Sequence, residues 1–118
     1  MRIYVASSWQ NDTKQHATVL ALREAGHEVY DFRQPVPGMG AFGWRFRRRG
    51  FDALRTADAT VLVLPCGSLA HLELGWATGA GQKTIILLDS PMSKSELMYL
   101  ACSKLCISIA EVIEELEE

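Results

Sequence analysis

The sequence has few cysteines and no long apolar run, and each shortage excludes a class of protein. Three cysteines occur in 118 residues, at positions 66, 102 and 106. An odd number with no zinc-like spacing argues against a disulfide framework and against a metal site. No apolar run approaches the roughly 20 residues that span a bilayer, and residues 1–6 lack the features of a signal peptide. We therefore expect a cytoplasmic protein with no membrane partner.

The chain also lacks an excess of charge of one sign. Its formal net charge is −2, so no overall field favours nucleic acid, and we expect no nucleic-acid partner. Five arginines gather in the middle of the chain, where they suit either a phosphate or a solvated helix face: Arg45, Arg47, Arg48, Arg49 and Arg55.

Two phosphate-binding or nucleophile motifs are missing, and a third does not stand where it would bind a dinucleotide. The sequence contains no GxxxxGK[ST] phosphate loop, and its GxGxxG match, at residues 38–43, does not directly follow the first predicted strand. It contains no GxSxG nucleophile elbow. These absences exclude the common nucleoside triphosphatases, dinucleotide-binding domains and serine hydrolases as models for this chain.

The composition is that of one globular domain, with 48% hydrophobic and 22% charged residues. Short apolar runs predict strands at residues 2–6, 27–32, 60–64, 84–88 and 104–107. Helical spacing predicts helices at residues 12–25, in the second half of 44–57, and at 68–79 and 93–101, with a last acidic helix. We expect Asp12, Ser68 and Ser108 to be N-caps, with Gln15 completing a capping box, and Gly26 to end the first helix. The proline- and glycine-rich residues 33–43 form a loop.

Strands that alternate with helices predict a Rossmann-like, flavodoxin-like α/β fold: a five-stranded parallel sheet with helices on both faces, in a single domain over residues 1–118. In such a sheet, ligands bind outside the carboxyl ends of the strands. The loops that begin at residues 7, 33, 65 and 89 form that edge.

Glu73 is the strongest candidate for chemistry. It lies in the second turn of the helix that begins at Ser68, among apolar neighbours, near the carboxyl edge of the sheet. A helix N-terminus favours an ionised carboxylate, and a partly desolvated carboxylate suits attack on an anomeric carbon. The competing interpretation is an exposed helix glutamate, which most glutamates are.

Other candidates follow the strands. Tyr4 is either a core residue or a group that orients a carboxylate. Ser7, Ser8 and Gln10 follow the first strand and suit either a ligand or a turn. Gly67 and Ser68 open a helix whose N–H groups can hold a phosphate or a sugar hydroxyl, or form a plain cap. We interpret Cys66 as a buried thiol with no histidine partner.

Several of these segments together resemble one known family, over most of the chain. The most specific match is Ala57-Asp58-Ala59-Thr60-Val61-Leu62-Val63-Leu64-Pro65-Cys66-Gly67 followed by Ala70-His71-Leu72-Glu73-Leu74-Gly75. Residues 2–8, 26–33, 79–84 and 96–99 match as well. The sequence is similar in these segments to nucleoside 2-deoxyribosyltransferases and the related nucleotide N-glycosidases.

The resemblance implies an enzyme that cleaves the N-glycosidic bond of a nucleoside or nucleoside 5′-monophosphate and passes the sugar to water or to another base. It implies that Glu73 is the nucleophile, that Tyr4 orients it, and that Ser7, Ser8, Gln10, Gly67 and Ser68 hold the ligand. It implies no cofactor, and a homodimer or larger assembly in which a residue near Ser93 or Ser95 completes the neighbour's site.

The sequence departs from the family in two places: the segment from Arg33 to Trp44 is shorter than in close relatives, and one family aspartate is not matched. The family carries an aspartate on the helix before the central strand, and the ungapped match places Gly50 there, with Asp52 two residues later. Either Asp52 takes that role through a shift of the chain, or the protein is a catalytically impaired nucleotide-binding module. A flavodoxin-like or receiver-like protein is the third alternative. The first predicted strand is followed neither by the paired acidic residues of a receiver nor by the Ser/Thr- and Gly-rich phosphate loop of a flavodoxin, which disfavours it.

Overall fold

The computed structural model describes residues 1–8, 12–31, 44–90 and 97–117. Among the earlier predictions, the loop at 33–43, the start of the helix at 93–101 and three candidate residues, Gln10, Ser93 and Ser95, lie outside these ranges.

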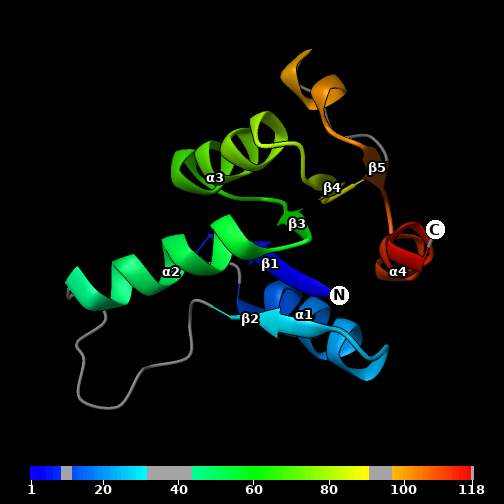
Figure 1. The fold of residues 1–118 in the computed structure, drawn as a ribbon. Helices are drawn as coiled ribbons and strands as arrows, with labels where there is room; N and C mark the ends of the chain where they lie inside the picture. Colours follow the sequence, from blue (N-terminus) through cyan, green and yellow to red (C-terminus); the bar gives the residue numbers. More distant parts are fainter. Residues whose placement is uncertain (9–11, 32–43, 91–96, 118) are drawn as a thin grey trace.

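Five parallel strands form one sheet in the order β2-β1-β3-β4-β5 (Figure 1). They are β1 (Arg2–Ala6), β2 (Glu28–Tyr30), β3 (Ala59–Val63), β4 (Lys83–Leu87) and β5 (Lys104–Cys106). The predicted fold class is therefore confirmed. This order is that of flavodoxin-like sheets, and it reverses direction between β1 and β3.

Helices cover both faces of the sheet (Figure 1). One face carries α1 (Asp12–Glu24) and α4 (Ile109–Glu117), and the other carries α2 (Trp44–Thr56) and α3 (Ser68–Gly79). A short 3₁₀ helix, η1 (Leu97–Ala101), precedes β5. Alternate side chains of β1 enter the two cores: Ile3 and Val5 pack on the α1 side, whereas Tyr4 and Ala6 pack on the α2 and α3 side. Tyr4 is thereby directed at the helix that carries Glu73.

Two helices end in the same way, as the sequence predicts for the first. At the end of α1, Gly26 has φ +96° and its N–H bonds the carbonyl of Arg23, while the His27 N–H bonds the carbonyl of Leu22. This is a Schellman motif. Gly81, with φ +82°, ends α3 with the equivalent pair of bonds. Glycine is favoured at both positions because a side chain is strained at positive φ.

The helix starts differ in part from the predictions. Asp12 is the first residue of α1 rather than its cap, and Gln15 is 1% exposed with its amide bonded to Asp31 at 2.9 Å instead of to the helix start. The N-cap of α3 is Gly67, not Ser68. The Ser108 cap is confirmed, because its hydroxyl accepts the N–H of Glu111 at 3.2 Å.

Other boundaries shift by a few residues. The second predicted strand is shortened to three residues, and β3 and β4 begin and end one residue earlier than predicted. Helix α2 spans the whole of Trp44–Thr56 instead of only its second half, and it continues through Gly50. Packing of Leu54 into the core below α3 outweighs the low helix propensity of that glycine.

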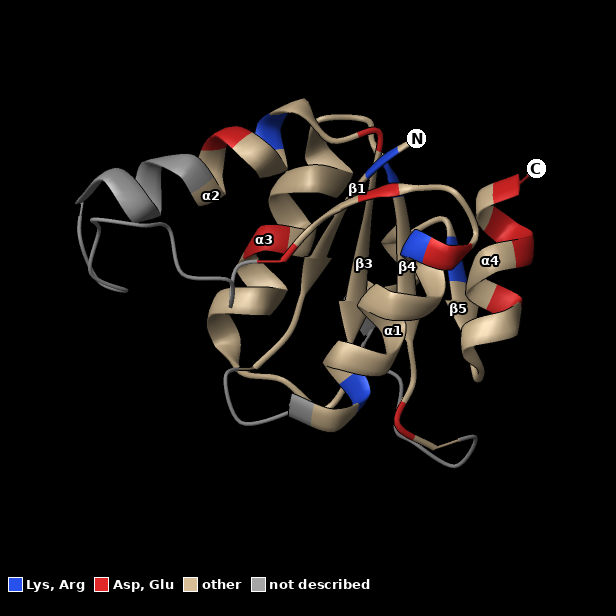
Figure 2. Cartoon of the chain, turned by 90° about the horizontal axis from the view of Figure 1, so that it is seen from below, with Lys and Arg blue, Asp and Glu red and all other residues tan. Residues whose placement is uncertain are grey.

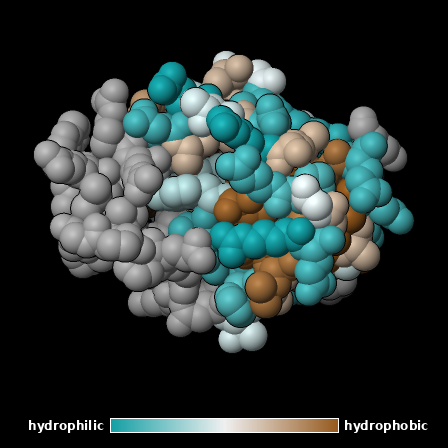
Figure 3. Space-filling view, turned by 60° about the horizontal axis from the view of Figure 1, so that its bottom comes forward, coloured by the Kyte–Doolittle hydropathy of each residue, from teal (hydrophilic) through white to brown (hydrophobic). Residues whose placement is uncertain are grey.

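Charge and apolar surface are distributed unevenly. The acidic residues of α4 lie on the side of the molecule away from α2 (Figure 2). The side on which α1 and β2 lie presents mostly hydrophilic side chains, with hydrophobic atoms visible between them (Figure 3). Among the described residues, no helix is long and apolar enough to cross a membrane.

Candidate active site

The strand order reverses between β1 and β3, which is where parallel α/β sheets most often bind ligands. The chain leaves β1 at Ala6 and β3 at Val63, and the following connections run to α1 and α3 on opposite faces of the sheet. Connections that diverge in this way leave a crevice outside the carboxyl ends of the strands. Ser7, Ser8 and Gly67, predicted to hold a ligand, belong to these two connections.

The structure brings Tyr4 and Glu73 together. Tyr4 stands in β1, and its hydroxyl donates a hydrogen bond to Oε2 of Glu73 on α3. The carboxylate lies in the second turn of the helix, beyond the first turn in which the partial positive charge of the N-terminus acts most strongly. One carboxylate oxygen is thus fixed by the phenol, which leaves Oε1 for other contacts.

Burial dominates the electrostatics of this pair. Burial raises the pKa of the Glu73 carboxyl, and the hydrogen bond from Tyr4 lowers it in part. Burial also raises the pKa of the Tyr4 phenol, to which the charge of Glu73 adds. Tyr4 therefore stays protonated and acts as a hydrogen-bond donor over the pH range in which Glu73 ionises.

Sequence analysis did not single out Tyr30, which lies directly beside Tyr4. The two residues are register partners in the β1–β2 ladder. Their rings are stacked, with centroids 5.7 Å apart and planes 8° from parallel. Equivalent positions on two neighbouring parallel strands are the signal that could have identified this pair.

On α2, Gly50 lies beside this pair, whereas Asp52 points elsewhere. A β-carbon on Gly50 would lie 3.8 Å from the Tyr30 hydroxyl. Asp52 is two residues further along a continuous helix, roughly 200° around its axis, and its carboxylate lies 3.5 Å from the Arg55 guanidinium. The described part of α2 contains no shift that would exchange the two positions.

A second group of polar side chains lies at the start of α3. Nδ1 of His71 donates to the Gly67 carbonyl at 2.8 Å, and Nε2 lies 2.7 Å from the Tyr99 hydroxyl. Cys66, expected to have no histidine partner, has its sulfur 3.5 Å from Nδ1 of His71. The expectation was wrong because the turn of α3 brings residue 71 back over residue 66. Burial, followed by the charge of Glu73, raises the pKa of the Cys66 thiol to about 11.

The remaining described ligand candidates follow β1 and β3 in the chain. Ser7 is 7% exposed, and its hydroxyl has no hydrogen-bond partner in the described part of the chain. Gly67 caps α3 without a side-chain hydrogen bond, and Ser68 is its exposed first residue. No sequence feature singled out Lys14 of α1. Its ammonium donates hydrogen bonds to the carbonyls of Leu64 at 3.1 Å and Leu88 at 2.9 Å, and it thereby links the ends of β3 and β4.

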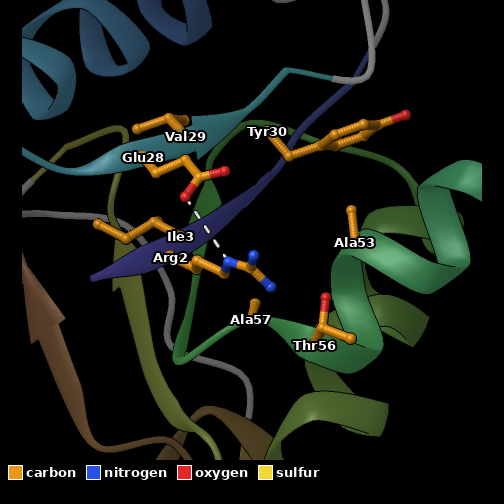
Figure 4. A pocket seen from close by; sticks show the side chains of 8 residues that line it. All are labelled: Arg2, Ile3, Glu28, Val29, Tyr30, Ala53, Thr56 and Ala57. Carbon is orange, nitrogen blue, oxygen red and sulfur yellow. Dashed lines mark ion pairs between the residues drawn. The ribbon is translucent and has the colours of Figure 1, made fainter.

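A separate hollow of about 250 Å³ lies between α2 and the first residues of β1 and β2 (Figure 4). Arg2 and Glu28 form an ion pair at its open side, with 3.6 Å between the charged atoms, and both side chains are largely exposed. The hollow is lined by Arg2, Ile3, Glu28, Val29, Tyr30, Ala53, Thr56 and Ala57. Neither Glu73 nor the ligand loops contribute to it.

Comparison with solved structures identifies the same fold in enzymes. The chain matches the 2-deoxyribosyltransferase of Bacillus psychrosaccharolyticus with a TM-score of 0.77 and 20% identity, over 96% of this chain and 90% of the other. It matches the CMP N-glycosidase BcmB of Clostridium botulinum with a TM-score of 0.66 and 20% identity, over the whole of both chains. The chain shares their fold. At this identity, the match alone does not carry their activity over to it.

A conserved protein from Enterococcus faecalis V583 also matches, with a TM-score of 0.71 and 12% identity over 98% of this chain and 96% of that one. No family model and no curated protein sequence matches the chain. The part of the chain that the structure describes holds no cluster of three histidine, cysteine or acidic side chains that could bind a metal ion.

Proposed function

We propose that the protein cleaves the N-glycosidic bond of a nucleoside or nucleoside 5′-monophosphate, with Glu73 as nucleophile. The observation that carries this proposal is the hydrogen bond from Tyr4 to Glu73 beside the crevice at the strand-order reversal. The Glu73 carboxylate is half-buried and its pKa is raised, so it is partly desolvated, and the Tyr4 hydrogen bond fixes one of its oxygens. Both features suit a nucleophile. Two solved structures with the same fold are a deoxyribosyltransferase and a nucleotide N-glycosidase, which supports this reaction class.

The reaction has two steps. In the first, Oε1 of Glu73 forms a bond to the anomeric carbon, while the bond from that carbon to the base nitrogen breaks and its electron pair leaves with the base, which takes a proton from solvent water or from Asp52. In the second, water or another base attacks the same carbon, gives its proton to solvent or to Asp52, and releases the Glu73 carboxylate. Throughout, the Tyr4 hydroxyl keeps Oε2 in place and balances the changing charge of the carboxyl group.

The start of α3 supports a phosphate or a sugar hydroxyl as the group held beside Glu73. Gly67 caps the helix without using a side chain, and the first turn has no acidic residue. Its N–H groups are therefore open to an anionic or hydroxyl ligand. The hydroxyls of Ser7, Ser8 and Ser68, together with Gln10, are the polar groups that we assign to the rest of the ligand.

A nucleotide-binding module with impaired catalysis is the second candidate, and Gly50 favours it. Glycine supplies no acid to the departing base, and Asp52 lies beside Arg55 on another side of α2. We keep Asp52 as the catalytic acid or sugar ligand of the enzyme proposal, where it would reach the substrate only through a change in α2. A module of this kind would bind the nucleotide and be stabilised by it without turnover.

We further propose that the protein is a homodimer that pairs through α3. Leu69, Leu72 and Trp76 lie along one side of this helix and are 66, 71 and 37% exposed, and Phe51 of α2 packs edge-on against Trp76. These four side chains are uncharged and apolar, so a second copy can bury them against its own α3 in a two-fold symmetric contact. Leu72→Asp should give monomers in sedimentation, whereas Leu20→Asp on α1 should leave the dimer intact; a monomeric native protein would overturn this proposal.

Base release tests the main proposal. The native protein and Glu73→Gln are incubated with nucleosides and nucleoside 5′-monophosphates, with and without a second base, and free base is followed by chromatography. Release by the native protein that Glu73→Gln abolishes supports the enzyme. Ligand-dependent thermal stabilisation without release would overturn it in favour of the binding module. Asp52→Asn, assayed in parallel, shows whether Asp52 takes part.

A further inference from the structure

The rings of Tyr4 and Tyr30 form a matched pair on neighbouring strands. As register partners in a parallel ladder, they leave the sheet on the same face. Their rings are nearly parallel, 8° apart in orientation, with centroids separated by 5.7 Å. The Tyr30 ring therefore limits how far the Tyr4 ring can turn toward β2, and with it the position of the hydroxyl that bonds Glu73.

Gly50 borders Tyr30 on the α2 side. The Tyr30 side chain extends from β2 toward α2 (Figure 4), and its hydroxyl would lie 3.8 Å from a β-carbon at position 50. That separation is an ordinary contact for a methyl group, but a branched side chain would enter the space that the hydroxyl occupies.

We propose that Tyr30 is a positioning residue for the chemistry at Glu73, and that the small residue at position 50 keeps it in place. The contacts form a chain across three elements: Gly50 of α2 borders Tyr30 of β2, Tyr30 stacks on Tyr4 of β1, and Tyr4 bonds Glu73 of α3. Hydrogen bonds weaken steeply with misalignment, so a small rotation of the Tyr4 ring weakens the bond that holds the nucleophile. This inference rests on the proposed function.

The chain of contacts assigns the effect to the ring of Tyr30 and not to its hydroxyl. Tyr30→Leu removes the ring, whereas Tyr30→Phe retains it. We expect Tyr30→Leu to lower kcat about tenfold or more with little change in KM, because misplacement of a reacting group costs rate more than binding. We expect Tyr30→Phe to restore most of that loss. A phenylalanine variant as slow as the leucine variant would overturn the proposal.

Gly50 provides a second pair of variants that does not alter Tyr30. Gly50→Ala should retain kcat, since a methyl group fits at 3.8 Å. Gly50→Leu should reproduce the kcat loss of Tyr30→Leu, and circular dichroism with thermal melting confirms that each variant is folded. Equal rates for the alanine and leucine variants would contradict the proposed role of position 50.

A titration of Glu73 separates this inference from the proposed function. The Glu73 carboxyl carbon is followed by NMR against pH and assigned by its loss in Glu73→Gln. Tyr30→Leu should raise the pKa of Glu73, because it loosens the Tyr4 bond that lowers that pKa, whereas Tyr30→Phe should leave it near the native value. This result is expected even if no substrate is cleaved. A Glu73 pKa unchanged in Tyr30→Leu would overturn the positioning role.

Discussion

The hydroxyl of Tyr4 is bonded to the carboxylate of Glu73, 69 positions further along the chain. The bond joins a central strand to the helix on one face of the sheet, beside the place where the strand order reverses. Among the described residues, it is the interaction that opposes the effect of burial on the Glu73 pKa. The state of the proposed nucleophile therefore depends on a residue of the first strand.

Replacing Tyr4 by phenylalanine should move the acid limb of the pH–rate profile to higher pH. The nucleophile must be ionised, so kcat/KM rises as pH passes through the Glu73 pKa, which burial already holds above its ordinary value. Without the Tyr4 hydroxyl, burial is unopposed, the pKa rises further, and the rate at neutral pH falls by about tenfold or more. Tyr99→Phe, which leaves the Tyr4–Glu73 bond in place, is the control. An acid limb at the native pH in Tyr4→Phe would contradict this account.

Glu73→Gln should stabilise the protein at neutral pH while it abolishes base release. Because the folded-state pKa of Glu73 is raised, the folded protein favours the protonated form. The cost of the buried charge is absent below the unfolded-state pKa and reaches its full size above the folded-state pKa. The Tm difference between Glu73→Gln and the native protein should therefore grow as pH rises from acid to neutral. A difference independent of pH would show that burial of the charge carries no cost.

Much of the fold could be predicted from the sequence. The buried run of β3 and the alternation of strands with helices specify a parallel sheet, because parallel strands need crossover connections. The glycine that ends α1 and the serine that caps α4 act through local backbone geometry, which a short stretch of sequence reveals. Strand ends are less predictable, because they depend on the neighbouring strand. β2 ends at Tyr30, the last of its residues that pairs with β1.

The site was only partly predictable for the same reason. Local sequence singled out Glu73 and Tyr4, and the resemblance paired them. Tyr30, Lys14 and the His71–Tyr99 pair depend on contacts between segments that are distant in sequence, which spacing along the chain does not show. The partners of Gln15 and Asp52 were likewise decided by tertiary contact and by helix phase.

The reactivity of Cys66 should report the charge of Glu73. The pKa of this thiol is raised to about 11, by burial first and then by the neighbouring carboxylate. Removing that charge in Glu73→Gln lowers the thiol pKa, so more thiolate is present at pH 8 to 9 and alkylation by iodoacetamide accelerates. Peptide mass spectrometry resolves Cys66 from Cys102, whose rate serves as the internal control. Equal Cys66 rates in both proteins would place the carboxylate too far away to act on the sulfur.

The hydrogen bond between Tyr99 and His71 should contribute measurably to stability. Because a carbonyl only accepts, Nδ1 of His71 carries the proton that bonds Gly67, and in the neutral ring Nε2 accepts the Tyr99 hydroxyl. Tyr99→Phe leaves that nitrogen without its donor while the buried ring stays packed. We expect a loss of about 1 kcal/mol in the free energy of unfolding in urea.

A double-mutant cycle isolates this bond from other effects of the two substitutions. Tyr99→Phe is measured in the native protein and again in a His71→Ala background, where the acceptor is absent. If the bond is responsible, the hydroxyl should matter in the first protein and have little effect in the second, giving a coupling energy of roughly 0.5 to 1.5 kcal/mol. Additive effects would instead mean that η1 is held to α3 by ring packing alone. Base release should survive Tyr99→Phe, since the Tyr4–Glu73 bond does not pass through this pair.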